Sequence, residues 1–412
     1  MSFMIAGIDV HKRVLMVAVT DASVGEGDLE FQYRKFGTTA AELQHLAAWL
    51  GERGVREVVM ESTAQYWKPV WAALEGQFRE HLAQAWSNRA PKGRKTDFKD
   101  AQRLVRRQIA GELTLSFVPE AEQRQMRILT RRQVQLSRDR VRLQNQLEAL
   151  LEEMRVKLSS MVTDLLGASG QRILRALAEG ETDAGKLAAL GDARLKCTRV
   201  QLQDALATPP SATLRAVLGM LLEQVAFLDR QSEQVGQLIV EAQRGWQEAI
   251  ARLVEIPGIR LRTAQQVLAE TGVTAATFPS AGQFASWMGA CPGREESAGE
   301  NRSGRCPKGN RYLRRVLCQA AQAAVRTKNS HFQAVFRRLV PKLGYTKAIW
   351  AIVRHMAEVI WKILHLGVRY VEQGSVTTPQ ALKRRIQRFT KELRDAGYTI
   401  EIKPPAVAGV QG

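Results

Sequence analysis

The sequence predicts a mixed fold, with an α/β domain at the N-terminus followed by two all-α regions. Up to about residue 115, short apolar runs alternate with amphipathic segments, which is the pattern of strands and helices built around one sheet. Between about residues 120 and 160, and again after Pro209-Pro210, apolar residues recur every seven positions and predict long helices. From about residue 251, shorter helical segments predict a compact helical region.

The N-terminal segments predict their elements one by one. IAGIDV and RVLMVAVT predict two strands joined by a tight turn, because only His11 and Lys12 separate them. The next predicted elements are a third strand, a helix over TAAELQHLAAWL and a strand over VREVVM. The unit is completed by a helix around YWKPVWAAL, a strand near HLAQAW and a helix from about Thr96. This order of strands and helices is that of a ribonuclease-H-like domain, which we expect to span residues 1–118.

Residues 119–250 are predicted to form a helical, coiled-coil region. The first long helix carries Leu129, Leu136, Leu143 and Leu150 in heptad register, although Gln133 and Arg140 weaken the alternate positions. The second helix begins after Ser211, a suitable N-cap, and repeats apolar residues at Leu214, Leu221, Leu228 and Val235. Two alternatives remain open here: the helices pack on each other within one chain, or they form an antiparallel arm that pairs two protomers.

Residues 251–370 are predicted to form a helical C-terminal domain, and residues 371–412 a basic tail. IPGIRLRTAQQVLAETG has the form of a helix-hairpin-helix, in which helix N-terminal amides can face a phosphate. The loop MGACPGREESAGENRSGRCPKGN follows, and helices are expected over about 311–326 and 346–365. A Pro-Gly turn also occurs in helical proteins that do not bind DNA, so this segment alone is a moderate signal.

Four carboxylates indicate a metal site: Asp9, Glu61, Asp97 and Asp100. Asp9 and Glu61 each end an apolar run expected to be a buried strand, and Asp97 and Asp100 share one face of a predicted helix. Taken singly, each of them is better explained by a strand end, a helix cap or a surface ion pair. Their joint order on this fold favours a site where two Mg²⁺ ions about 4 Å apart assist phosphoryl transfer.

Basic side chains lie close to these acids and to a glycine-rich loop. Residues 89–107 contain eight Lys or Arg, of which those expected to bind nucleic acid are Lys92, Arg94, Lys95, Lys99 and Arg103. A second expected set is Arg302, Arg305, Lys308, Arg311, Tyr312, Arg314 and Arg315. Ser297 precedes this second set; a serine attacks a phosphodiester only when its proton is removed and the anion is stabilised, although most serines in such loops are not catalytic.

The charge balance indicates a polyanionic partner. Lys and Arg number 60 against 41 Asp and Glu, giving a formal net charge of +19. We expect nucleic acid and no membrane, because the chain has no apolar run of about 18 residues and no signal-peptide pattern at its N-terminus. A cytoplasmic location is therefore expected.

Five motifs together resemble one known family. GIDVHK, VVMESTAQYWKPV, GRKTDFKDAQRLV, IPGIRLRTAQQVLAETG and the segment from CPGREESAG to RCPKGNRYLRRVL are similar, in this order, to the DEDD-type transposases of the insertion-sequence one-ten family. By matching motif, the resemblance implies that Asp9, Glu61, Asp97 and Asp100 are the metal ligands and that Ser297 is the nucleophile. The sequence departs from the family at Ala64, where glycine is frequent, and at Ala298, where many members carry another serine.

The resemblance also implies a mechanism and partners. Such proteins are bacterial recombinases with a RuvC-like domain, a coiled-coil arm and a C-terminal transposase domain, which form a phosphoserine link to DNA in the presence of Mg²⁺. The implied partners are donor and target DNA, an element-encoded bridge RNA that guides the reaction, and further protomers in a dimer or tetramer whose RuvC-like and serine domains face each other across protomers. Association with the nucleoid is expected when the protein is active.

Two other functions remain open from the residues alone. The chain could be a RuvC-like, structure-selective endonuclease in which water attacks the phosphate, so that no covalent adduct forms. It could also be a non-catalytic scaffold that binds nucleic acid, in which case Asp97→Asn would leave DNA exchange unchanged.

Overall fold

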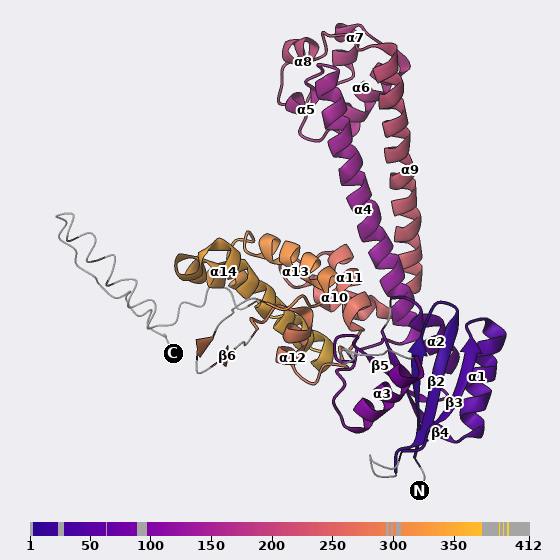
Figure 1. The fold of residues 1–412 in the computed structure, drawn as a ribbon. Helices are drawn as coiled ribbons and strands as arrows, with labels where there is room; N and C mark the ends of the chain where they lie inside the picture. The colour runs from indigo at the N-terminus through magenta and orange to yellow at the C-terminus, as the bar shows by residue number, and fades with distance from the viewer. Residues whose placement is uncertain are drawn as a thin grey trace. The chain divides into compact units, whose positions relative to one another are not determined.

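The computed structural model divides the chain into two compact units, Met1–Glu120 and Ala121–Gly412 (Figure 1). The structure describes residues 3–23, 29–62, 64–88, 97–293 and 306–372, together with 387, 390 and 394; for residues 97, 296–297 and 300–301 it describes the backbone alone. Among these described residues, no helix has the length and apolar character needed to cross a membrane.

The first unit is a five-stranded mixed sheet with helices on both faces. Its elements are β1 (Met4–Val10), β2 (Val14–Asp21), β3 (Gln32–Gly37), α1 (Ala40–Glu52), β4 (Val55–Glu61), α2 (Trp67–Leu74), β5 (Arg79–Ala83) and α3 (Asp97–Ile109). The strand order is β3-β2-β1-β4-β5, with β1 antiparallel to β2 and parallel to β4. The order of elements predicted from the sequence is confirmed, and the sheet is consistent with a ribonuclease-H-like domain.

Alternating residues of β1 pack against different helices. Ala6, Ile8 and Val10 share a buried cluster with the apolar residues of α1 and α2, whereas Ile5 shares one with Leu104 and Val105 of α3. Gly7, on the α3 face, allows the closest approach, because a Cβ built there would lie 2.3 Å from the carbonyl oxygen of Ala101. The glycine therefore sets how near α3 lies to the strand that carries Asp9.

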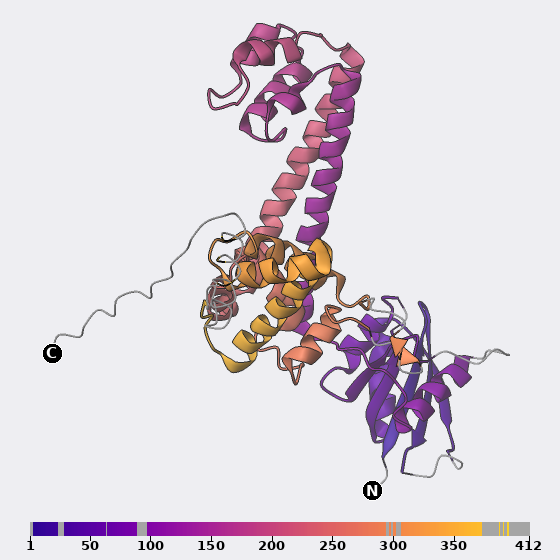
Figure 2. The same cartoon turned by 90° about the vertical axis from the view of Figure 1, so that its left-hand side faces the viewer.

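Two long helices of the second unit, α4 (Ala121–Glu153) and α9 (Ala212–Ala242), lie side by side (Figures 1 and 2). Leu147, Leu218 and Val225 are among the residues buried between these helices and the short helices at one end of the pair. The polar position Arg140 is matched by Asp229, whose Oδ1 lies 2.7 Å from the Arg140 Nε. The two helices thus pack within one chain, the first of the two alternatives, and pairing between protomers stays a prediction.

Four short helices fill the segment between α4 and α9, and Figure 1 shows them gathered at the far end of the pair. They are α5 (Leu158–Met161), α6 (Ala168–Glu179), α7 (Ala184–Ala189) and α8 (Arg199–Ala205). Ser211 caps α9 as predicted, since its side chain accepts a hydrogen bond from the Leu214 amide at 3.3 Å. These four helices were not predicted from the sequence.

The rest of the second unit is a helical core. Its elements are the short helix η2 (Arg244–Trp246), α10 (Gln247–Val254), α11 (Leu261–Thr271), α12 (Ala281–Met288), β6 (Glu296–Ser297), β7 (Glu300–Asn301), α13 (Arg311–Ala324) and α14 (His331–Leu366). The turn between α10 and α11 packs on α13, because a Cβ at Gly258 would lie 2.2 Å from the Ala320 carbonyl oxygen. Phosphate binding by this helix pair stays a prediction. Helix α14 begins earlier than expected and is interrupted at Gly344, where φ is +73°.

Candidate active site

Asp9 and Glu61 lie at the same edge and on the same face of the sheet. The parallel register of β1 and β4 pairs Gly7 with Val59 and Ile8 with Met60, so Asp9 and Glu61 follow as the next residues on the two strands. Because side chains alternate along a strand, both point to the face that α3 covers. Neighbouring strands lie about 4.8 Å apart, a separation at which two carboxylates can share one cation.

The helix α3 places a third carboxylate near this edge. Asp100 is buried, with 5% of its surface exposed, and it directly precedes Ala101, which covers Gly7. Its Oδ1 lies 2.8 Å from an Nη atom of Arg103, one turn further along the helix. Asp97 is the first residue of α3, and its side chain lies outside the described part of the structure.

A buried asparagine connects Glu61 to Asp100. Asn88, which follows β5 and is 3% exposed, donates from Nδ2 to the Glu61 Oε2 at 2.7 Å. Arg103 in turn donates from Nε to the main-chain oxygen of Asn88 at 3.2 Å and to its Oδ1 at 3.3 Å, while pairing with Asp100. Two candidate ligands from different elements are therefore held by one hydrogen-bonded network.

Sequence reasoning missed Asn88, because an asparagine after a strand carries no signal that it will turn inward. Arg103 was expected to bind nucleic acid, and its guanidinium instead contacts Asp100 and Asn88 in this structure. Lys99 is exposed on α3 and could bind a phosphate, whereas Lys92, Arg94 and Lys95 lie outside the described residues. Whether any of these residues contacts nucleic acid stays a prediction.

The donor set suits a hard divalent cation. Carboxylate oxygens are the ligands that Mg²⁺ prefers, and Asp9, Glu61 and Asp100 supply them from one edge of the sheet. In the described part of the chain, no three His, Cys, Asp or Glu side chains are arranged to hold a metal ion. The contacts present indicate why: Arg103 pairs with Asp100, and the His11 Nε2 lies 3.1 Å from the Asp9 Oδ2. These two side chains would move when a cation is shared.

In the second unit, Ser297 lies in a loop whose two ends meet. A Cβ at Gly309 would lie 2.2 Å from the Met288 carbonyl oxygen, and one at Gly289 would lie 2.7 Å from that of Pro307. The residues in between include the hairpin of β6 and β7, in which Ser297 pairs with Glu300. The serine side chain lies outside the described residues, as do Arg302 and Arg305, so its reactivity stays a prediction.

Arg314 holds this junction together. Its Nη1 donates to the carbonyl oxygens of Gly289 and, at 3.2 Å, of Pro307, and its guanidinium lies 4.2 Å from the centre of the Trp350 ring. Lys308 and Arg311 are exposed, and Tyr312 and Arg315 are partly exposed. The structure thus ties Arg314 into the loop ends and leaves the other four accessible to a ligand.

Comparison with known proteins gives two family matches and one relative. Residues 6–156 match a transposase family of the DEDD type, and residues 250–337 match the family described as transposase IS116/IS110/IS902. A "Probable family 20 transposase" of Pseudomonas aeruginosa is 28% identical over 319 residues, which cover 74% of this chain and 83% of that protein. The four acids fall within the first family match and Ser297 falls within the second.

Proposed function

Since this chain belongs to the IS110 family of DEDD-type transposases, whose substrate is DNA, we propose that it cleaves and rejoins DNA through Ser297 under the guidance of an element-encoded RNA. The observation that supports this most is the arrangement of Asp9 and Glu61 at one sheet edge, with Asp100 linked to Glu61 through Asn88 and Arg103.

The four acids have one task in this proposal, which is to hold Mg²⁺. When bound, the cation offsets negative charge that develops on the scissile phosphate. Before that, Asn88 and Arg103 hold Glu61 and Asp100 near the end of the sheet, and Arg103 would release the Asp100 carboxylate when the cation is shared. His11, whose Nε2 lies 3.1 Å from the Asp9 Oδ2, would likewise release that carboxylate.

Ser297 supplies the nucleophile. Its Oγ forms a bond to phosphorus while the bond from phosphorus to one sugar oxygen breaks, and the serine proton ends on the released sugar hydroxyl. A second sugar hydroxyl reverses the exchange and releases the serine. The number of phosphoester bonds is conserved, so rejoining needs no nucleotide energy source, in keeping with a sequence that has no GxxxxGK[ST] loop.

Sequence choice would lie with the RNA. If base pairing between a guide RNA and DNA selects the site, the protein needs mainly to bind phosphates and helix shape. A net charge of +19 is consistent with that task.

A second protomer is part of the proposal. Exposed apolar side chains recur along α9 at Val217, Met220, Phe227 and Leu238, separated by three, seven and eleven residues. These spacings place them toward one side of the helix, where Phe227 also lines a hollow with Leu143 of α4. Such a row fits pairing between arms, which would let the acids of one protomer meet the serine of another.

The test is to incubate purified protein with element-flanking RNA, DNA and Mg²⁺ and to look for a covalent protein–DNA adduct. Wild type and Ser286→Ala, a control at an exposed serine of α12, are expected to form the adduct and recombinant product, and Ser297→Ala neither. An adduct with Ser297→Ala would show that another residue is the nucleophile. Cleaved DNA without any adduct would support the water-dependent endonuclease instead.

A further inference from the structure

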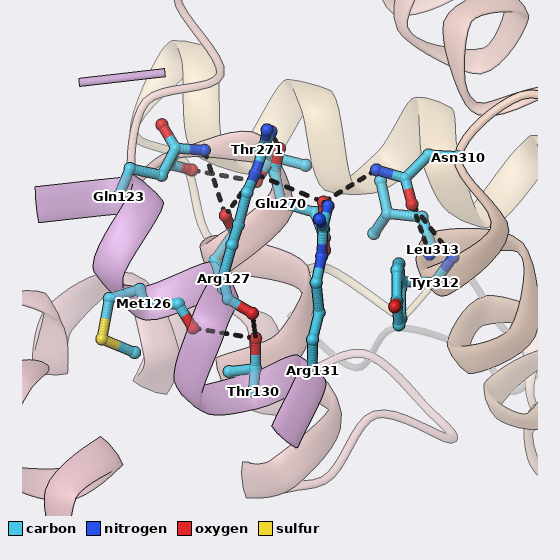
Figure 3. Close-up of polar contacts among 12 residues, drawn as sticks. Gln123, Met126, Arg127, Thr130, Arg131, Glu270, Thr271, Asn310, Tyr312 and Leu313 are labelled. Atoms are coloured by element: carbon cyan, nitrogen blue, oxygen red, sulfur yellow. Dashed lines mark hydrogen bonds and ion pairs between the residues drawn. The ribbon is translucent and has the colours of Figure 1, made fainter. Parts of the chain in front are cut away.

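A buried glutamate joins three helices at the base of the α4–α9 pair. Glu270 of α11 is 2% exposed, and both its oxygens accept hydrogen bonds from Arg131 of α4, at 2.8 Å each (Figure 3). Arg127, one turn earlier on α4, lies 3.3 Å from the Glu270 Oε2 and also donates to the carbonyl oxygens of Ala269 and Glu270. Burial lowers the pKa of Arg127 to about 10, the neighbouring Glu270 opposing this shift.

The same carboxylate fixes the first turn of α13. Asn310, the N-cap of α13, donates from Nδ2 to the Glu270 Oε2 at 2.8 Å. Its Oδ1 accepts from the amides of Tyr312 at 3.0 Å and Leu313 at 3.2 Å (Figure 3). Because Glu270 binds both Arg131 and Asn310, it fixes the position of α4, the first helix of the α4–α9 pair, relative to the start of α13.

Arginines of α4 and α13 lie close to each other beside Glu270. The Tyr312 ring has the guanidinium of Arg131 at 4.5 Å from its centre and that of Arg311 at 5.0 Å, and Arg311 also donates to the Tyr312 hydroxyl. One turn further on α13 is Arg315, whose pKa is lowered by burial and by the charge of Arg138. Arg138 follows Arg131 by seven residues and lies on the same side of α4.

Four cations therefore form two rows with one buried anion beneath them. Arg131 and Arg138 belong to α4, and Arg311 and Arg315 to α13; Glu270 compensates only part of their charge. Asp139, beside Arg138, is paired with Arg142 and accepts from Gln135. Like charges held together in this way are favourable when an anion with repeated charges, such as a phosphodiester chain, lies across them.

We infer that Arg131, Arg138, Arg311 and Arg315 form a binding site for the backbone of the DNA strand that Ser297 attacks, so that the arm helix itself contacts the substrate. This inference rests on the proposed function, which identifies the strand. DNA is favoured over RNA because α13 begins directly after the loop that carries Ser297, and a phosphate at Ser297 continues into neighbouring phosphates of the same strand. Glu270 is the positioning residue that keeps the two rows together.

Binding of full-length protein to a fluorescent DNA duplex over a series of KCl concentrations tests the site. The variant Arg138→Ala/Arg315→Ala removes two partly or fully exposed cations, and Arg175→Ala on α6 removes an exposed arginine far along the arm. Each lost phosphate contact should lower the slope of log K against log salt by about 0.9, so about 1.8 for the double variant. The Arg175→Ala slope should equal that of wild type.

A slope unchanged by Arg138→Ala/Arg315→Ala would overturn the inference. So would a loss confined to a single-stranded RNA of the same length, because the site would then hold RNA. The adduct assay separates this result from the proposed function: an adduct at Ser297 with an unchanged slope refutes the arginine site alone. If wild-type protein forms no adduct but the double variant still shows the reduced slope, Ser297 is not the nucleophile, and the four arginines remain a DNA-binding site.

Discussion

The variant Glu270→Gln tests the buried carboxylate that joins α4, α11 and α13. The substitution keeps the shape of the side chain and one oxygen acceptor, but it removes the negative charge that Arg127 and Arg131 share. The new amide group would also face the donors of Arg131 or Asn310, so at least one of these hydrogen bonds would be lost.

The expected loss of stability follows from the burial of Glu270 and of its two arginine partners, Arg127 and Arg131. Removing one member of a buried ion pair usually costs about 3–5 kcal/mol, because the other charge stays behind without compensation. The Arg127 side chain is 13% exposed and the Arg131 side chain 38%, so water can solvate part of the remaining charge. We therefore expect the free energy of unfolding of this unit to fall by about 3 kcal/mol, at the lower end of that range.

Urea unfolding followed by circular dichroism measures the change. The control is Glu241→Gln, which breaks an exposed pair between Glu241 of α9 and Arg244 of η2 and should change the free energy of unfolding by less than about 1 kcal/mol. If Glu270→Gln unfolds at the same urea concentration as Glu241→Gln, the buried carboxylate does not hold the three helices together.

Three further outcomes are expected. Gly7→Ala should push α3 away from β1, because the new Cβ would overlap the Ala101 carbonyl oxygen; we expect a loss of about 1–3 kcal/mol in urea unfolding, and an unchanged midpoint would contradict the close packing. Ala64→Gly should raise stability by about 1 kcal/mol, since φ is +47° at this position; a thermal shift downward would argue against strain there. Burial, and next the charge of the neighbouring His331, lowers the pKa of His355 in the folded protein. Stability should therefore fall as the pH drops below about 6.5, because His355 in the unfolded chain binds a proton at a higher pH than it does in the folded protein. His355→Gln should flatten that part of the stability profile, and a profile identical to that of wild type would exclude His355 as its cause.

Local patterns predicted most of the first unit. The short break after Val10 predicted a hairpin, and in the structure three residues, 11–13, form this turn, where the amide of His11 donates to the Val14 carbonyl oxygen at 3.0 Å. Asp9 and Glu61 were expected together because each ends an apolar run of the kind that forms neighbouring buried strands, and the structure adds that these strands are parallel. The heptad spacing likewise predicted α4 and α9, and Ser211 marked where α9 begins.

The contacts that complete the site depend on tertiary packing, which no local pattern encodes. Asn88 contacts Glu61 of β4 and Arg103 of α3, and α3 can lie this close to the sheet because Gly7 lies under Ala101. The pair of Arg131 and Glu270 joins residues 139 positions apart in the chain. The first part of α14 was missed for another reason: Pro341 and Gly344 are helix-breaking residues, yet helix extends on both sides of them.

Titration of the purified protein with Mn²⁺, read by electron paramagnetic resonance, tests the shared cation site most directly. We expect Asp9→Asn, Glu61→Gln and Asp100→Asn each to weaken binding at least tenfold, a loss of about 1.4 kcal/mol, because each removes a charged ligand from the same ion. The control is Glu57→Gln, because Glu57 lies toward the other end of β4 and pairs with Arg79 and His81. This variant should bind Mn²⁺ as tightly as wild type. If any of the three variants binds Mn²⁺ as tightly as wild type, these acids do not share one cation.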